Sequence, residues 1–429
     1  MSGLDQVRRI VGARLERSWA SPRPEAADLL ILAVRHRFLV GVAVFAAASW
    51  LTLDDAVLGQ GNGWALFALL AVPAAVLLRG RPRLAALALV AGGILLRLAV
   101  AGVWQADPVA VTVAAGQAAL NGYNPYGHGY AAAVPPGAPF PYGPLALLWG
   151  LPGQAVESAA AIATMVLFVL TGSWITLGLY AADSFAVHSA SQGVNDLSPG
   201  LLIAVGFLLL RNRPVIGGLV LAVAAAIKPY AFAWFPAAVG YAGVPALIGL
   251  AGGSVVLWSP LLDWGIGSYV KSVAMARAVH ATPNALNVPE LRVLGIPIAI
   301  AGLWVRRWEV AVALGSVVFI VVLFFDHWAS RGYWLAVLPI VGIAAEGWVV
   351  RRAPSLVRLL RGLPIRSTDG VEATGGAALE REGVSGAFRA SLGGGLSQGS
   401  LAAQPVNADE TDGPQLQAIA DAGDWTEGR

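Results

Sequence analysis

The chain has 429 residues, of which 57% are hydrophobic and only 12% are charged, and its mean hydropathy is +0.68. A soluble domain carries about 25% charged residues, so this composition excludes an ordinary soluble globular protein. The absence of cysteine excludes disulfides and cysteine-based metal sites, and a net charge of +3 is too small to indicate nucleic-acid binding. Continuous apolar runs approach the ~20 residues that cross a bilayer, which predicts helices rather than alternating barrel strands.

Basic residues divide the chain. The first cluster is a polar, arginine-bearing segment, 1–37, which lacks the early apolar run of a cleavable signal peptide. Further clusters lie at 79–83, 211–213, 306–307 and from residue 351 onward. Together they hold 22 of the 28 Lys and Arg residues. The positive-inside rule assigns all five clusters, and therefore both termini, to the cytoplasm of a multi-pass inner (plasma) membrane protein.

The apolar segments between these clusters predict an all-α polytopic transmembrane bundle of about 11–12 spans, which occupies residues 38–350. The predicted spans are 38–53, 64–78, 84–104, 140–154, 156–181, 197–210, 214–228, 230–242, 244–258, 289–304, 309–325 and 333–350. The segment 140–154 is short and could be re-entrant. We count it as crossing, because only an odd number of crossings between residues 104 and 211 keeps the cluster 211–213 inside.

A long exterior loop, 105–139, follows the third span and begins with Asp107 at the membrane exit. Residues 109–120 have helical spacing and predict a helix along the membrane interface. NGYNPYG (121–127) is typical of turns, and PPGAPFPYGP (135–144) predicts a rigid return to the membrane. A loop of this length in a compact protein is usually functional.

Polar side chains of later segments reach the same exterior face under this topology. They are Asn195, Asp196, Lys228, Asp263, Tyr269, Lys271, Arg277, His280, Asp326, His327 and Arg331. Alone, each has an ordinary explanation, since interfacial Lys and Arg extend toward water and Asp107 could be a helix-end carboxylate in water. Arg97, however, lies within a span, where a charge usually faces a partner or a polar cavity. Cations beside a carboxylate suit a phosphate group with a proton acceptor nearby.

The chain contains no P-loop, no G-x-G-x-x-G after a strand, no H-E-x-x-H and no D-x-D pair. We therefore expect no bound nucleotide, no metal and no cofactor, and no nucleic-acid partner.

The order of several segments resembles the GT-C superfamily of membrane glycosyltransferases, most closely glycosyltransferase family 87. The first is ILLRLAV, then Asp107, AAGQAALNGYNPYG and FPYGPLALL, which is similar to the family's first long loop. The middle region matches in QGVND, RNRP and GGLVLAVAAAIKPYAF, and the late loop in DHWASRGYWLAVLP. The resemblance covers roughly residues 84–350. The chain departs from it in reading Tyr-Gly-Pro-Leu, where the family has Tyr-Pro-Pro-Leu.

This resemblance implies transfer of a sugar, commonly mannose, from a polyprenyl-phosphate donor to a glycolipid or lipid-linked glycan on the non-cytoplasmic face. It implies inversion at the anomeric carbon with Asp107 as general base, and a donor phosphate held by Lys228, His327, Arg97 and Arg331. Acceptor or sugar contacts are expected from Asn121, Tyr123, Asn124, Tyr126, Tyr142, Asn195, Asp196 and His280.

Two other functions remain open from the sequence. A lipid or solute transporter or flippase would use the same basic pocket for a headgroup, although transporter sites usually lie near the bilayer midplane. A scaffold of an envelope-assembly complex would use the long loop and the C-terminal tail to bind partners. In that tail, 351–366 is basic and amphipathic and predicts contact with the anionic leaflet, and 367–429 has too few large apolar residues to fold.

Overall fold

The computed structural model describes residues 24–57, 81–99, 107–133, 135–149, 154–279, 288–326 and 332–361. These all belong to the first of two compact units, Met1–Ile365; the second is Arg366–Arg429. The predicted span 64–78, the tail 367–429 and the site residues His280, His327 and Arg331 lie outside the described residues.

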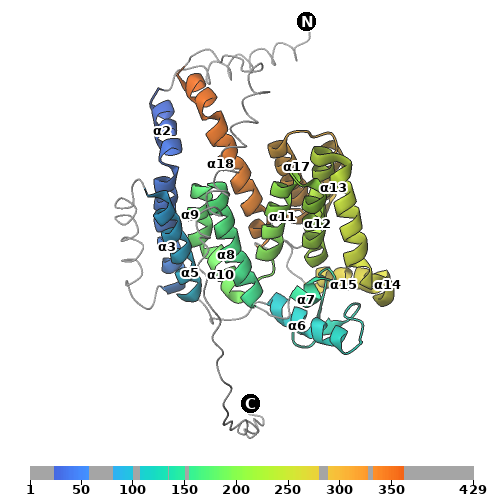
Figure 1. Ribbon diagram of the computed structural model, residues 1–429. Coiled ribbons are helices and arrows are strands. Elements are labelled where there is room, and N and C mark those ends of the chain that lie inside the picture. The colour runs from blue at the N-terminus through green and yellow to red at the C-terminus, as the bar shows by residue number, and fades with distance from the viewer. Residues whose placement is uncertain are drawn as a thin grey trace, which may run out of the picture. The chain divides into compact units, whose positions relative to one another are not determined.

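The described chain is almost wholly helical, as predicted (Figure 1). Its helices are α2 (Pro24–Arg35), α3 (Arg37–Val57), α5 (Pro82–Ala99), α6 (Asp107–Leu120), α7 (Ala146–Trp149), α8 (Gln154–Thr171), α9 (Trp174–Ala182), α10 (Ser184–Gln192), α11 (Leu197–Leu210), α12 (Pro214–Ile227), η1 (Pro229–Trp234), α13 (Phe235–Trp258), α14 (Pro260–Trp264), α15 (Ile266–Val279), η2 (Pro289–Leu294), α16 (Gly295–Gly302), α17 (Trp308–Phe324) and α18 (Tyr333–Leu360). Two short strands, β1 (Gly129–Tyr130) and β2 (Ala138–Pro139), pair antiparallel within the long loop. The helix predicted over 109–120 is confirmed as α6.

Among the described residues, Pro229–Trp258 and Tyr333–Leu360 are long and apolar enough to cross a membrane. The number of such segments rises to four if two sharply bent helix pairs each count as one span. The apolar helices therefore support membrane association, and the predicted total of 11–12 spans stays a prediction.

Small residues let the central helices approach closely. A Cβ atom added to Gly249 of α13 would lie 2.0 Å from the carbonyl oxygen of Val215 in α12, so no other residue fits there without movement. Such close contacts through glycine and alanine are typical of helix packing in membranes, where lipid removes the hydrophobic drive for association.

The segment Pro229–Trp258 folds back on itself at Gly243. That residue has a φ of 71°, outside the helical range, within α13. The rings of Phe232 and Trp258 have centroids 5.5 Å apart, whereas a straight helix would separate these residues by about 39 Å. The chain therefore forms two antiparallel helical arms, in agreement with the separate segments predicted over 230–242 and 244–258.

The single span predicted over 156–181 is wrong, because the structure divides it into α8 and α9. Gly172 has a φ of 68° at the turn, and Phe168 of α8 contacts Tyr180 of α9, with ring centroids 5.5 Å apart. The α9 helix therefore returns along α8. The carboxylate of Glu346 in α18 stabilises the new helix start by accepting hydrogen bonds from the amides of residues 174–176.

The crossing predicted over 140–154 is also wrong for its described part. Residues 146–149 form only the four-residue helix α7, which is about 6 Å long and cannot span a bilayer. Pro141 and Pro144 each disfavour a helical conformation of the residue before them, so the helix does not extend back through residues 140–143.

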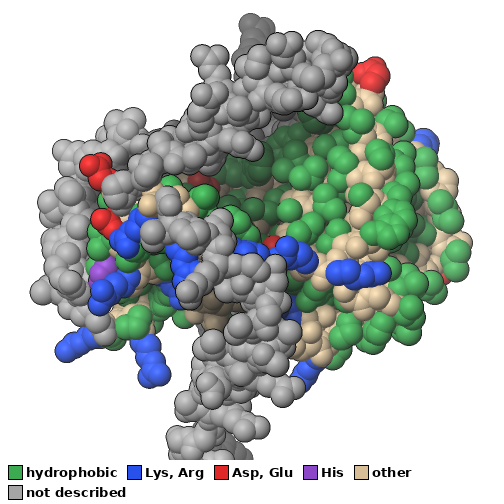
Figure 2. Space-filling view, turned by 90° about the horizontal axis from the view of Figure 1, so that it is seen from above, with side chains coloured by type: hydrophobic (Ala, Val, Ile, Leu, Met, Phe, Trp, Pro, Cys, Tyr) green, Lys and Arg blue, Asp and Glu red, His purple; other side chains and the backbone are tan. Residues whose placement is uncertain are grey.

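The basic clusters after residue 200 gather at one end of the helices. The Arg211 guanidinium lies 5.5 Å from the ring centroid of Trp308, and Arg351 forms an ion pair with Glu309. Figure 2 views this end, where several Lys and Arg side chains are visible. Residues 351–360 continue α18 without interruption instead of forming a separate segment.

Candidate functional site

A buried ion pair lies at the opposite end of the helices. Asp196 immediately precedes α11 and Lys228 immediately follows α12, and the turn at 211–213 joins these two helices. The two residues therefore lie together, far from the basic turn. Lys228 Nζ donates to Asp196 Oδ1 at 2.6 Å, and the two side chains are only 7% and 2% exposed. This contact brings together two residues that the sequence placed only on a common face.

Aromatic rings surround the lysine. The Lys228 ammonium lies 5.2 Å from the ring centroid of Tyr142, 5.5 Å from that of Tyr230 and 5.9 Å from that of Tyr333. The Tyr230 hydroxyl also donates to Asp196 Oδ1 at 2.9 Å. Cation–π contacts and the carboxylate offset part of the hydration that the lysine loses on burial.

A second buried carboxylate, which the sequence analysis missed, fixes the start of α11. Glu157 of α8 accepts hydrogen bonds from the amides of Leu197 and Ser198 at 3.1 and 3.0 Å, and from the Ser198 hydroxyl at 2.5 Å. An acid near a helix N-terminus satisfies free amide donors and complements the helix dipole. Glu157 thus holds the backbone beside Asp196. An acidic residue inside an apolar segment was the signal available in the sequence.

Asn195 is the unsatisfied group of this site. Both polar atoms of its side chain are buried, and neither has a hydrogen-bond partner among the described residues. Leaving a buried amide without partners costs about 1–3 kcal/mol for each group. An amide in this state, one residue from Asp196, is suited to a hydroxyl-bearing ligand.

The long loop is attached directly to the end of α12. The amides of Gly143 and Leu145 donate to the carbonyls of Ile227 and Ala226, both at 3.0 Å. A Cβ atom on residue 143 would lie 2.2 Å from the Ala226 oxygen, and a proline there could not donate. Glycine is therefore required in the Tyr-Gly-Pro-Leu sequence, and this attachment places the ring of Tyr142 beside Lys228.

Within the loop, two predicted contact residues make hydrogen bonds that hold the loop together. Asn124 donates to the carbonyl of Trp264 in α14 at 2.6 Å and accepts from the Tyr126 amide at 2.9 Å. Tyr126 is buried, its hydroxyl donates to the Tyr142 carbonyl at 3.2 Å, and burial raises the pKa of its phenol. Asn121 and Tyr123, by contrast, are exposed. Figure 1 shows α6, α7, α14 and α15 together at this end of the helices.

Asp107, the predicted base, is the first residue of α6, and its side chain lies outside the described residues. The helix that it begins contacts α7 and β1, so its backbone belongs to the loop structure attached to α12.

Arg97 is held by backbone carbonyls. Its guanidinium donates to the carbonyls of Ala181 and Tyr180 at 2.9 and 3.2 Å, and to Gly93 at 3.0 Å. The first two are at the C-terminal end of α9, where a cation complements the helix dipole. These contacts tie α5 to α9, and they are separate from the contacts of Lys228.

A second charged cluster joins α15, η2 and the end of α17. Asp326 accepts from Arg277 at 2.7 Å and from Arg292 at 2.8 Å. The Arg277 side chain is 52% exposed, and the Asp326 side chain is 15% exposed. The sequence placed Arg277 and Asp326 on the exterior face, without pairing them.

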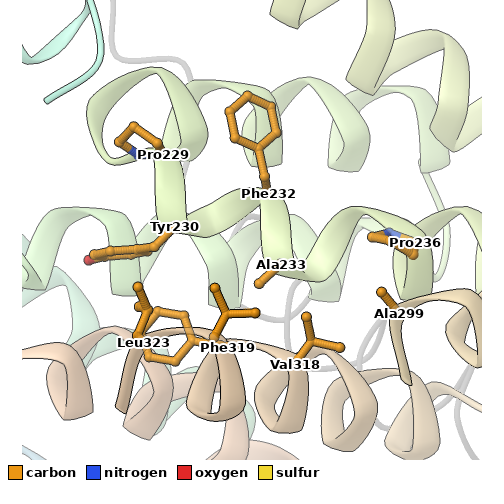
Figure 3. Close-up of a pocket in the computed structure, with 10 residues that line it drawn as sticks. Pro229, Tyr230, Phe232, Ala233, Pro236, Ala299, Val318, Phe319 and Leu323 are labelled. Atoms are coloured by element: carbon orange, nitrogen blue, oxygen red, sulfur yellow. The ribbon is translucent and has the colours of Figure 1, made fainter. Parts of the chain in front are cut away.

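An apolar cavity of about 280 Å³ lies between η1, α13, α16 and α17. Its lining residues are Pro229, Tyr230, Phe232, Ala233, Pro236, Ala299, Val318, Phe319, Val322 and Leu323. Figure 3 shows Tyr230 at one edge of this set. Tyr230 therefore lines the cavity, and its hydroxyl contacts Asp196.

The described residues hold no group of three or more His, Cys, Asp or Glu side chains placed to bind a metal ion. The chain has no match among protein-family models, curated proteins or solved structures.

Proposed function

We propose that the protein is a membrane glycosyltransferase. It transfers a sugar, which we propose to be mannose, from a polyprenyl-phosphate donor to a glycolipid or lipid-linked glycan. The observation that carries this proposal is the position of Tyr230, which lies between an apolar cavity and a buried polar cluster. An amphipathic substrate needs both environments side by side: an apolar surface for its prenyl chain and polar groups for its sugar phosphate.

The polar cluster provides groups that suit a sugar. The Asn195 amide has no hydrogen-bond partner among the described residues, Asp196 and Lys228 offer an acceptor and donors, and the Tyr142 ring offers an apolar face. A sugar ring presents hydroxyls at its rim and C–H groups on its faces, so this mixture of amide, charge and aromatic surface is chemically complementary.

Asp107 is the proposed general base. In the reaction the acceptor oxygen forms a bond to the anomeric carbon as the bond from that carbon to the phosphate oxygen breaks. The electron pair leaves with the lipid phosphate, and the hydroxyl proton passes to the Asp107 carboxylate. Attack from the face opposite the phosphate inverts the anomeric carbon.

The exterior face is the proposed side of the reaction. The ion pair of Asp196 and Lys228 lies at the end of α11 and α12 that is opposite the basic turn 211–213, and the positive-inside rule assigns such a turn to the cytoplasm.

One observation favours a transporter or flippase as the second candidate. The helices α10 and α11 form a broken pair bent by 112°, and the break contains Asp196. Discontinuous helices with ionisable groups at the break are typical of transporter sites.

Sugar transfer in membranes separates these functions. Membranes containing the protein are incubated with radiolabelled polyprenyl-phosphate mannose, and labelled acceptor lipid is extracted and counted. We expect transfer by the wild type and by D263N, which removes an exposed acid of α14, and a loss of at least about 100-fold in D107N. Equal transfer by D107N and the wild type would eliminate Asp107 as the base. No transfer by any of the three would favour the transporter.

A further inference from the structure

The cluster of Arg277, Arg292 and Asp326 carries an excess of positive charge. Two guanidinium groups share one carboxylate, so the three side chains together carry a charge of +1. The pair of Lys228 and Asp196, by comparison, is neutral and almost fully buried. The two-arginine cluster is also the more accessible, since its arginine side chains are 52% and 29% exposed.

The arginines retain unused hydrogen-bond donors. Each guanidinium has five N–H groups, and the contact with Asp326 is made through one terminal nitrogen of each. The Nε atom of Arg292 is buried and has no partner in the described part of the chain. Two planar guanidinium groups that converge on one point, with donors to spare, match the several acceptor oxygens of a phosphate.

Asp326 connects the cluster to the apolar cavity and to one of the three tyrosine rings around Lys228. The Asp326 amide donates to the carbonyl of Leu323, one of the cavity-lining residues, at 3.3 Å. The ring of Phe324, two residues before Asp326, has its centroid 6.3 Å from that of Tyr333, and Tyr333 is one of the three rings around Lys228. A ligand whose apolar chain occupied the cavity could therefore place its headgroup at the arginines.

We propose that Arg277 and Arg292 form a binding site for a phosphate monoester at the edge of the apolar cavity, with Asp326 as the internal anion that occupies them when no ligand is bound. The assignment of this phosphate to a prenyl lipid rests on the proposed function. A phosphate monoester carries nearly two negative charges at neutral pH, whereas a sugar phosphodiester carries one. Two arginines thus match the departing lipid phosphate better than the intact donor, so the site stabilises the charge that develops as the sugar leaves.

Binding of defined probes to the full-length protein in detergent micelles tests this site. The probes are farnesyl phosphate, the uncharged alcohol farnesol and inorganic phosphate, and dissociation constants are measured by titration calorimetry. The variants are R277Q, R292Q and D326N. The matched control is K271Q, which removes an exposed cation of the same helix, α15.

We expect R277Q and R292Q each to weaken farnesyl phosphate binding by about tenfold, as for the loss of charged hydrogen bonds, with farnesol binding unchanged. K271Q should bind as the wild type does. D326N should bind farnesyl phosphate at least as tightly as the wild type, because it removes the competing anion. Raising the salt concentration should weaken farnesyl phosphate binding and leave farnesol binding unaffected.

Three results would overturn the proposal: unchanged affinity in both arginine variants, an equal loss of farnesol binding, or a tenfold loss in D326N, which would make Asp326 a support of the arginines. Arginine-dependent binding of inorganic phosphate as tight as that of farnesyl phosphate would refute the lipid source and assign the site to free phosphate. Failure of sugar transfer with this binding intact would refute the proposed function alone.

Discussion

Breaking the ion pair of Asp196 and Lys228 should destabilise the fold far more when one partner is removed than when both are. The two charged atoms are 2.6 Å apart and nearly inaccessible. At an effective dielectric constant of ~20, their attraction is about 6 kcal/mol, and much of this is offset by the lost hydration of both ions. Removing one charge leaves the other buried without compensation, at a cost of about 3–5 kcal/mol.

The variants D196N and K228M each remove one charge at similar size, and the double variant removes both. We expect each single variant to lower the free energy of unfolding by about 3–5 kcal/mol, and the double variant by less than either. The resulting coupling energy should be at least about 3 kcal/mol. Equilibrium unfolding in mixed detergent micelles, followed by tryptophan fluorescence, measures all four proteins.

D263N serves as the control, because Asp263 is exposed on α14. Its unfolding free energy should stay within about 0.5 kcal/mol of the wild type. Additive losses in the double variant would refute the reasoning, since they would show that the two side chains stabilise the protein independently and not as a compensated pair.

Three further changes test the supports of the site. G143A should lower the unfolding free energy by about 1–3 kcal/mol, because its new methyl group meets the carbonyl of Ala226. The control G252A, whose new methyl group meets nothing within 4 Å, should be neutral or slightly stabilising in the same unfolding assay. E346A should cost about 1–3 kcal/mol, since it leaves the first amides of α9 without their carboxylate; a change below 0.5 kcal/mol, measured in the same way, would show that water replaces it. Burial raises the pKa of Tyr130 to about 12. The difference between absorbance titrations of the wild type and Y130F should therefore show a step near that pH. A step at the ordinary pKa of tyrosine would contradict the burial.

The local features of the fold could be predicted from composition and spacing. The helix over 109–120, the helices 197–210 and 214–227, and the reversal at Gly243 follow from apolar run lengths, turn residues and arginine positions. Each of these signals lies within a few residues of the feature that it predicts.

The incorrect span predictions, over 156–181 and 140–154, arose where a residue distant in the sequence determines the local structure. The division of 156–181 depends on Glu346, which caps α9 from a helix about 170 residues later in the chain. The path of 140–149 depends on carbonyls of α12, to which Gly143 and Leu145 donate. Neither partner can be identified from a local pattern of hydrophobicity.

The candidate site could be predicted only in part, because its contacts also join residues that are far apart in the sequence. Topology placed Asp196 and Lys228 on one face, and their contact agrees with that placement. The carbonyl partners of Arg97 could not be predicted, because they exist only once α9 is a separate helix. The role of Asn124 depends on Trp264, to which it donates across the loop.

The central claim is that one amphipathic substrate occupies both the apolar cavity and the polar cluster that meet at Tyr230. The most direct measurement is mannose transfer by the purified protein as a function of donor concentration, for the wild type and for A299F, which fills the cavity from α16. We expect A299F to raise the KM for a long-chain polyprenyl-phosphate donor by at least about tenfold, or ~1.4 kcal/mol, with little change for a donor of two prenyl units. Transfer in A299F that matches the wild type at every concentration of the long-chain donor would contradict this claim.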